Sequence, residues 1–280
     1  MAFPTIPTTG NGRITHTLNT AGGATKTFPN LSLITKNLGD LLLAIIIEYD
    51  GNSTNAEFSG WGGSFLEFGD FAGTTTMAIG CAYKFSTGSE TGTFNVTTAD
   101  TSTSDSALII MSIAGAHATT PPEAGSFATG VNATMPNPAA FNPAGWDAED
   151  TLWLAIGGCG EDATTGSFTG IAGPPANYGD GYQTGISQDV VGGVEGAVAF
   201  RQLNASSEDV GTRTQDTSNA RHAAAVVAVR PAPEILTPQH RNVRAVYQQA
   251  VQRAATRMVA DAIRRPSGIL VPRLWTPASC

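Results

Sequence analysis

The sequence predicts a mainly β protein, with an antiparallel β-sandwich body followed by an α-helical C-terminal extension. Three observations predict this fold class: short apolar runs between turn residues, a composition rich in Gly and Thr, and an abrupt change of composition near residue 230. The chain has 280 residues, including 32 Gly and 16 Pro that suit tight turns. One large sandwich and two small domains are both compatible with this length, and we expect a single large sandwich.

Apolar runs of the first half of the chain recur in the second half in the same order. Each run is short and is bounded by Gly, Asp, Ser or Thr, as expected for a buried strand between turns. The matched runs are 39–46 with 149–156, 77–85 with 194–201, and 106–113 with 222–229. This order predicts two similar halves, about 31–118 and 141–230, in a sandwich domain of residues 25–231 that follows an N-terminal extension of residues 1–24.

Charge is divided unequally along the chain. The net charge is −8, but the residues from Arg230 onward include eight basic and two acidic residues, a net charge of +6. Residues 1–229 hold the other seven basic and 21 acidic residues, a net charge of −14. The strand pattern ends at Val229, and Pro231-Ala232-Pro233 is a stiff spacer. We therefore expect an acidic body with a basic helical anchor at residues 232–280.

The basic segment is predicted to form one helix from Pro238 to Arg264. Thr237 suits the N-cap, Pro238 suits the first helical position, and Pro266 ends the pattern. Apolar residues recur at helical spacing in one stripe, and arginines occupy much of the remaining surface. We expect the stripe to contact another subunit, with packing on its own body as the alternative; a nucleic-acid or membrane role is least favoured because Ala dominates the stripe. The predicted assembly residues are Val243, Tyr247, Ala250, Val251, Ala254, Met258, Arg244, Arg253 and Arg257.

The sequence contains no recognisable catalytic or metal-binding pattern. The four His residues are far apart and lack the spacing of zinc ligands. Nucleophile-elbow, P-loop and His-Glu-x-x-His motifs are absent. Glu149-Asp150 and Glu161-Asp162 flank one predicted strand, and we interpret them as solvated turns rather than a glycosidase pair. The sequence thus predicts no enzyme activity, no bound metal and no cofactor.

Three aromatic residues, Trp61, Tyr178 and Tyr182, are candidate glycan contacts, because exposed rings beside Asp or Asn can stack on sugars. Capping of the sandwich edge is the favoured role for these residues, with glycan contact as the alternative. His222 and the cysteines Cys81 and Cys159 fall in or beside predicted core strands, so we expect a structural histidine and buried thiols.

The N-terminal residues do not form a signal-peptide pattern, and no apolar run approaches the ~20 residues that span a bilayer. We therefore expect a protein that is made in a cytoplasm and has no membrane partner.

Several of these segments together resemble β-sandwich modules of bacteriophage minor tail and other virion proteins. In the first half the resemblance rests on residues 39–44, 60–61, 82–84 and 106–115, and in the second half on residues 150–155, 178–182 and 223–231. It covers roughly residues 25–231, and the Arg-rich helix is not part of it. The resemblance implies a jelly-roll or concanavalin-like (lectin-like) sandwich with a structural role in the virion, and no catalytic residues to transfer.

The expected function is therefore that of a non-enzymatic virion protein, a minor tail, tail-tip or fibre-associated subunit anchored through its C-terminal helix. Capsid decoration is the nearest alternative. A carbohydrate-binding module for host recognition is the second alternative, and a lectin-like hydrolase is the third. The expected partners are other virion proteins and copies of the chain itself, with a host surface glycan as a further candidate and neither nucleic acid nor membrane.

Overall fold

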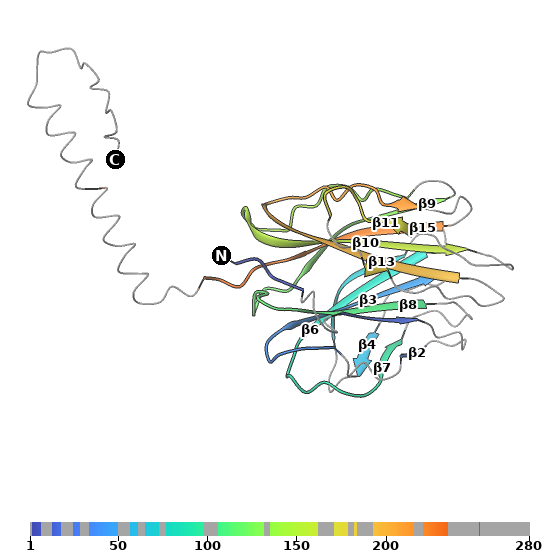
Figure 1. The fold of residues 1–280 in the computed structure, drawn as a ribbon, viewed down its shortest axis with the longest axis horizontal. Coiled ribbons are helices and arrows are strands. Elements are labelled where there is room, and N and C mark those ends of the chain that lie inside the picture. Colours follow the sequence, from blue (N-terminus) through green and yellow to red (C-terminus); the bar gives the residue numbers. More distant parts are fainter. Residues whose placement is uncertain are drawn as a thin grey trace, which may run out of the picture. The chain divides into compact units, whose positions relative to one another are not determined.

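The computed structural model describes residues 2–6, 13–17, 25–28, 34–49, 57–60, 65–72, 77–97, 106–131, 135–161, 171–178, 182–183, 193–215, 221–234 and 252. The chain divides into two units, Met1–Pro233 and Glu234–Cys280. The described part of the first unit is mainly β and is built from antiparallel sheets (Figure 1). In the second unit the structure describes Glu234 and Gln252, of which Gln252 is helical and exposed.

The first half of the body forms two sheets. A five-stranded sheet has the order β1-β8-β3-β6-β5, and a three-stranded sheet has the order β2-β7-β4. All of their strand pairs are antiparallel. The strands are β1 (Arg13–Thr17), β2 (Thr25–Phe28), β3 (Leu41–Tyr49), β4 (Glu57–Gly60), β5 (Leu66–Ala72), β6 (Met77–Phe85), β7 (Phe94–Thr97) and β8 (Ser106–Ile113).

The second half also forms a five-stranded sheet and a smaller one. Their orders are β12-β13-β10-β15-β9 and β11-β14, again with antiparallel pairs. The strands are β9 (Glu123–Val131), β10 (Glu149–Glu161), β11 (Ile171–Gly173), β12 (Tyr182–Gln183), β13 (Gly193–Ala205), β14 (Thr214–Gln215) and β15 (Arg221–Val229).

The two five-stranded sheets have the same topology. In the first sheet the middle strand β3 lies between β8 and β6, and in the second sheet the middle strand β10 lies between β15 and β13. Strand β10 therefore corresponds to β3, β15 to β8 and β13 to β6. The edge strands β9 and β12 correspond to β1 and β5, and the pair β11-β14 corresponds to β4-β7. The three repeated apolar runs of the sequence are these three central strands of each sheet.

Central strands bury both of their faces, which explains why their sequences are continuously apolar. Successive side chains of a strand point to opposite faces. On β3, Leu43 and Ile45 lie in a core shared by the two five-stranded sheets, whereas Leu42 and Ala44 lie in a second core with residues of the three-stranded sheet. On β10, Leu154 faces the shared core and its neighbours belong to a third core on the outer side. The sheets are therefore stacked in layers, with the large sheets inside (Figure 1).

Glycines on β10 bring the two large sheets close together. A Cβ atom on Gly158 would lie 2.7 Å from Cγ2 of Ile47, and one on Gly160 would lie 2.2 Å from the ring of Tyr49. These distances are well below ordinary van der Waals contact, so only glycine fits there without a shift of β3.

The described residues of the N-terminal extension contribute to the first large sheet and to the shared core. β1 pairs with β8 at the edge of the first large sheet. Thr5 forms an isolated bridge with Ala114, and Ile6 is buried in the shared core. The strand was missed because it has one aliphatic residue, Ile14, and so no apolar run.

Candidate functional site

The candidate functional site is the place where the chain leaves the body toward its basic C-terminal segment. Here the link between the two halves, residues 114–117, has a partner on each side. Thr5 and Ala114 exchange two backbone hydrogen bonds of 2.9 Å. The amide of His117 donates to the carbonyl of Arg230 at 2.9 Å, and the amide of Ala232 donates to the carbonyl of Gly115 at 2.8 Å. We call residues 115–117 and 230–232 together the exit junction.

The side chain of Arg230 holds the exit junction against the sheet. Its Nε donates to Oε2 of Glu149 at 2.8 Å, and its Nη2 donates to the other carboxylate oxygen of Glu149. The guanidinium also lies over the ring of Trp146, 5.6 Å from its centroid, within the range of a cation–π contact. The hydrogen bond with Glu149 raises the pKa of Arg230, although burial opposes it, and the negative charges of Glu149, Asp147 and Glu123 act in the same direction as the hydrogen bond.

The link is also ordered by one of its own side chains. Nδ1 of His117 accepts hydrogen bonds from the backbone amides of Thr120 at 3.0 Å and of Thr119 at 3.3 Å. Gly115 has a φ of +74°, a backbone conformation that favours glycine. The link is thus also held by contacts that do not involve Arg230.

Glu149 and Asp150, which the sequence predicts to lie in a solvated turn, are both engaged in contacts. Glu149 is 7% exposed and forms the two-point contact with Arg230. Oδ1 of Asp150 accepts a hydrogen bond of 2.6 Å from Asn204 on the neighbouring strand β13. Glu149 and Arg230 are 81 positions apart, so no local pattern reveals their pairing. The side chains of Glu161 and Asp162 lie outside the described residues.

Most of the predicted interface residues are outside the part of the chain that the structure describes. This holds for all nine predicted assembly residues between Val243 and Met258, and for Trp61. Tyr182 is described only as part of strand β12. Their roles therefore stay predictions.

Tyr178 is a buried residue, not the exposed aromatic that the sequence suggested as a glycan contact. It is 6% exposed and packs in the outer core of the second half beside Trp146 and Trp153. Its hydroxyl donates to Oε1 of Glu208 at 3.4 Å. Burial, together with the nearby charge of Glu208, raises the pKa of Tyr178. The ring offers no free face for a sugar.

A buried charged cluster near Tyr178 was not found from the sequence. Arg213 is 7% exposed and its Nη2 donates to the carbonyl of Ala155 at 2.5 Å. Burial lowers the pKa of Arg213 to about 10, while the negative charge of Glu195 acts against this effect. Glu195, 4% exposed, also accepts a hydrogen bond of 2.9 Å from the amide of Ile171. The signal available in the sequence was an acid inside an apolar strand run, Val194-Glu195-Gly196.

Gly157 makes room for this cluster. A Cβ atom on Gly157 would lie 2.6 Å from Cδ of Arg213 and 2.8 Å from its Nε. An ion pair in the same region is formed by Arg201 and Glu208, whose Nη1 and Oε1 atoms are 3.0 Å apart. Because Arg213 and Glu208 bind groups from other segments through their side chains, the cluster is suited to fix the outer layer of the second half.

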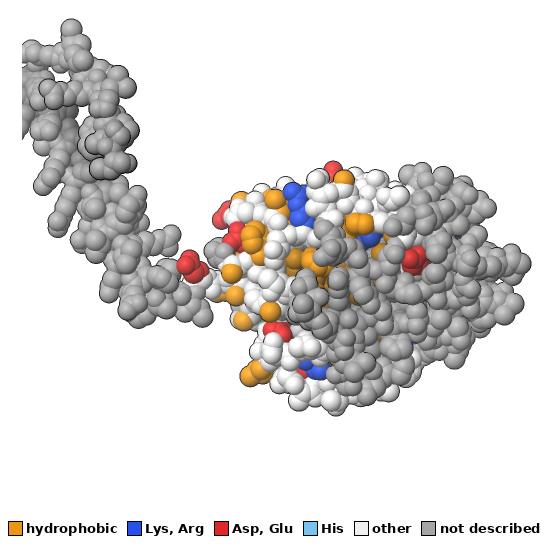
Figure 2. All heavy atoms as spheres, viewed as in Figure 1, with side chains coloured by type: hydrophobic (Ala, Val, Ile, Leu, Met, Phe, Trp, Pro, Cys, Tyr) orange, Lys and Arg blue, Asp and Glu red, His pale blue; other side chains and the backbone are white. Residues whose placement is uncertain are grey.

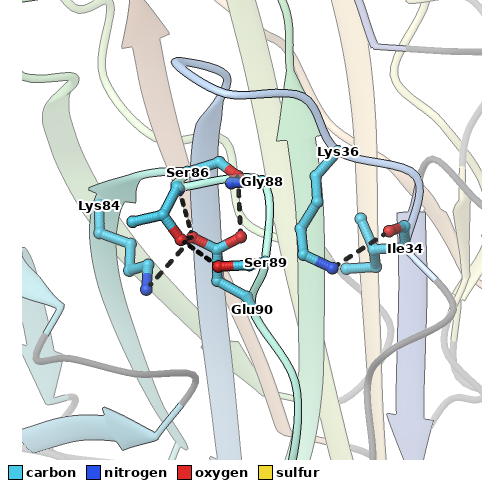
Figure 3. Close-up of polar contacts among 8 residues, drawn as sticks. Ile34, Lys36, Lys84, Ser86, Gly88, Ser89 and Glu90 are labelled. Atoms are coloured by element: carbon cyan, nitrogen blue, oxygen red, sulfur yellow. Dashed lines mark hydrogen bonds and ion pairs between the residues drawn. The ribbon is translucent and has the colours of Figure 1, made fainter.

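The first half has its own buried carboxylate, in the turn after β6. Oε2 of Glu90 accepts a hydrogen bond of 2.8 Å from the hydroxyl of Ser86, and Oε1 accepts one of 2.5 Å from the amide of Thr87. Nζ of Lys84 is 3.5 Å from Oε1 (Figure 3). Burial alone would raise the pKa of Glu90, but the hydrogen bonds from Thr87 and Ser86 prevail and lower it from its usual 4.5 to about 2.

The lowered pKa of Glu90 predicts that the body becomes less stable in acid. Since its pKa is lowered on folding, Glu90 stabilises the body fully above pH 4.5, and this contribution is lost as the pH falls toward 2. We expect the free energy of unfolding to fall between pH 4.5 and 2 by less in Glu90→Gln than in the unmodified chain, as measured by urea titration at several pH values. Glu234→Gln, which removes an exposed carboxylate, is the control and should keep the full slope. Equal slopes for all three proteins would contradict the role of Glu90.

The described surface has few charged side chains. Figure 2 shows Lys, Arg, Asp and Glu scattered among uncharged groups in this view, in keeping with the charged fraction of 14%. Leu38 and Leu66 are the large apolar residues most exposed among the described ones, at 81% and 60%. A surface of this kind is compatible with packing among other proteins.

Within the described ranges, no group of three or more His, Cys, Asp and Glu residues is arranged as metal ligands would be. The same residues include no helix that is long and apolar enough to cross a membrane. Cys81 and Cys159 are buried, and His222 is fully buried.

Comparison of the chain with family models, with curated proteins and with solved structures gives no match.

Proposed function

We propose that the chain is a non-enzymatic structural protein of a bacteriophage virion, a minor tail, tail-tip or fibre-associated subunit. In this proposal the β body is displayed and the basic segment after residue 233 anchors it to other virion proteins or to copies of itself. The observation that supports the proposal most directly is the exit junction, where backbone hydrogen bonds and the Arg230–Glu149 pair fix the end of the body. The chain then changes to a segment of opposite net charge.

We also infer that each half of the body is a jelly roll. In a jelly roll, eight strands form two facing sheets with the orders 1-8-3-6 and 2-7-4-5. The first half has β1-β8-β3-β6 in one sheet and β2-β7-β4 in the other, with β5 at the edge of the first sheet. The second half follows the same order without a described counterpart of β2. Jelly rolls recur in viral capsid and lectin domains, which agrees with a virion role.

The charged groups near the exit junction support a structural role rather than a catalytic one. Glu149, Glu208 and Arg230 are each engaged in a contact with another side chain of the body. Capsid decoration is the nearest alternative location, and the two are distinguished by electron microscopy of particles in which this chain is labelled.

Deleting residues 233–280 should leave a soluble, folded and monomeric body that no longer enters particles. The reason is that the described core clusters consist of residues up to Val229. The measurements are thermal unfolding, light scattering coupled to size-exclusion chromatography, and the copy number of the chain in purified particles. Val251→Asp with Met258→Asp, in the full chain, should also abolish incorporation by placing charge on the predicted apolar stripe.

Incorporation of the truncated chain at normal copy number would contradict anchoring by this segment. Aggregation of the truncated chain would instead indicate that the segment covers an apolar surface of its own body.

A further inference from the structure

Several contacts converge on Arg230, the last residue before the Pro231-Ala232-Pro233 spacer. Its carbonyl accepts from His117, its guanidinium contacts both oxygens of Glu149, and the same guanidinium lies over Trp146. Two further carboxylates, Asp147 and Glu123, are close enough to act on its charge. These contacts are not part of the strand pairing of β15, so they indicate an additional role for Arg230.

The partners of Arg230 come from three different elements. Glu149 begins β10, the middle strand of the second large sheet, and Trp146 precedes it in the outer core. His117 lies in the link between the halves, which is itself paired with Thr5 through Ala114. Arg230 thus connects the segment after β15 both to the link and to the middle strand of the second large sheet.

The same arrangement exists at the end of the first half in simpler form. Ala114, directly after β8, bridges Thr5 of the N-terminal segment, and Pro231, directly after the β15 region, bridges Ala116 of the link. In both halves the segment after the last strand therefore pairs with the segment before the first strand. The second half differs because it adds the side-chain contacts of Arg230, and it is this half from which the basic segment continues.

We propose that Arg230, Glu149 and Trp146 form an exit latch, in which Arg230 is the positioning residue that fixes the point and the backbone direction at which the chain leaves the body. Two-point pairing of a guanidinium with a carboxylate fixes geometry as well as supplying attraction. Proline then restricts the backbone of the next residues, Pro231 to Pro233. The role of this latch in the virion rests on the proposed function, in which the segment after residue 233 is the anchor.

The latch is tested on the full chain by hydrogen exchange. In Glu149→Gln the carboxylate charge is lost at nearly constant shape, and the amides of His117 and Ala232 should exchange about 10-fold faster or more, because a charge-assisted two-point contact is replaced by a weaker one. Amides in the middle of β15, such as that of Ala225, should be unchanged. Arg230→Lys should show the same local effect, since Lys keeps the charge but not the planar fork.

Asp150→Asn is the matched control. It removes the same charge from the adjacent residue, whose carboxylate accepts a hydrogen bond from Asn204 on β13. The amides of His117 and Ala232 should keep their protection in this variant. Unchanged protection of these two amides in both Glu149→Gln and Arg230→Lys would overturn the latch, and so would an equal acceleration of all body amides, which would indicate a general stabilising pair.

Measuring how much of the Glu149→Gln chain enters particles distinguishes a failure of the latch from a failure of the anchoring function. Faster local exchange with normal incorporation retains the latch and speaks against its use in anchoring. Faster exchange with reduced or irregular incorporation, together with normal incorporation of Asp150→Asn, supports both.

Discussion

Replacing Glu195 by Gln is expected to lower the free energy of unfolding of the body by about 1–3 kcal/mol, because the buried guanidinium of Arg213 loses the negative charge that favours its ionised form. Arg213 is buried in the outer layer of the second half, and the charge of Glu195 is the largest influence that favours its ionised form. Gln can still accept a hydrogen bond from Ile171, so the loss reports on charge rather than on the backbone contact. The measurement is urea unfolding at neutral pH, followed by far-UV circular dichroism.

The double variant Glu195→Met with Arg213→Met is the control for this interpretation. Replacing two buried groups of opposite charge together by apolar residues of similar size is often close to neutral. We expect the double variant to be more stable than Glu195→Gln, although the carbonyl of Ala155 loses its hydrogen bond from Arg213. A loss in Glu195→Gln below about 1 kcal/mol, the size of an ordinary hydrogen bond, would show that the charge of Glu195 does not stabilise buried Arg213.

The central strands could be predicted from the sequence because both of their faces are buried. Six apolar runs correspond to β3, β6, β8, β10, β13 and β15, which are the three inner strands of each large sheet. The mainly β, antiparallel character follows from the same runs. The edge strand β1 and the short strands β2 and β7 could not be found in this way. In β2, for example, buried Lys26 and Phe28 alternate with exposed Thr residues over four positions, which is too short and too polar for a clear signal.

The exit junction and the buried cluster could not be predicted, because their partners are far apart in the sequence. Glu149 and Arg230 each lie at the end of a predicted strand, where a charged residue is ordinarily solvated. Only the antiparallel pairing of β10 with β15 brings these two strand ends together. The burial of Tyr178 could not be predicted for a related reason: the residue stands in a turn region rich in Gly and Pro, and it packs with Trp146 and Trp153 from other segments.

The second large effect is expected when the two halves are separated. Chains ending near Thr120, or starting there and ending at Glu234, should not exist as stable folded monomers. The core shared by the two large sheets contains Leu43, Ile45, Ile109, Leu154 and Val227 among many other fully buried residues. Either half alone would expose this whole apolar face to water, at a cost of roughly 25 cal/mol for each Å².

The contacts between the two large sheets are arranged almost symmetrically, which indicates how a separated half would behave. β3 contacts β10, β6 contacts β15, and β8 contacts β13. Because β10, β15 and β13 correspond to β3, β8 and β6, these contacts are related as in a two-fold symmetric interface, in which one patch meets its own equivalent. The edge strands continue the pattern, since the rings of Phe71 on β5 and Phe127 on β9 are stacked 5.5 Å apart.

An isolated half should therefore either unfold or pair with a second copy of itself through its inner face. The second half is less suited to self-pairing, because Gly158 and Gly160 on β10 are shaped for Ile47 and Tyr49 of the first half. We expect the isolated first half to form dimers or larger species and the isolated second half to be mostly unfolded, whereas a chain of residues 1–234 unfolds in one cooperative transition. Size-exclusion chromatography with light scattering, together with calorimetry, distinguishes these outcomes. If both halves were monomeric and each showed its own sharp unfolding transition, the shared core would not be what holds the body together, and the two halves would be independent domains.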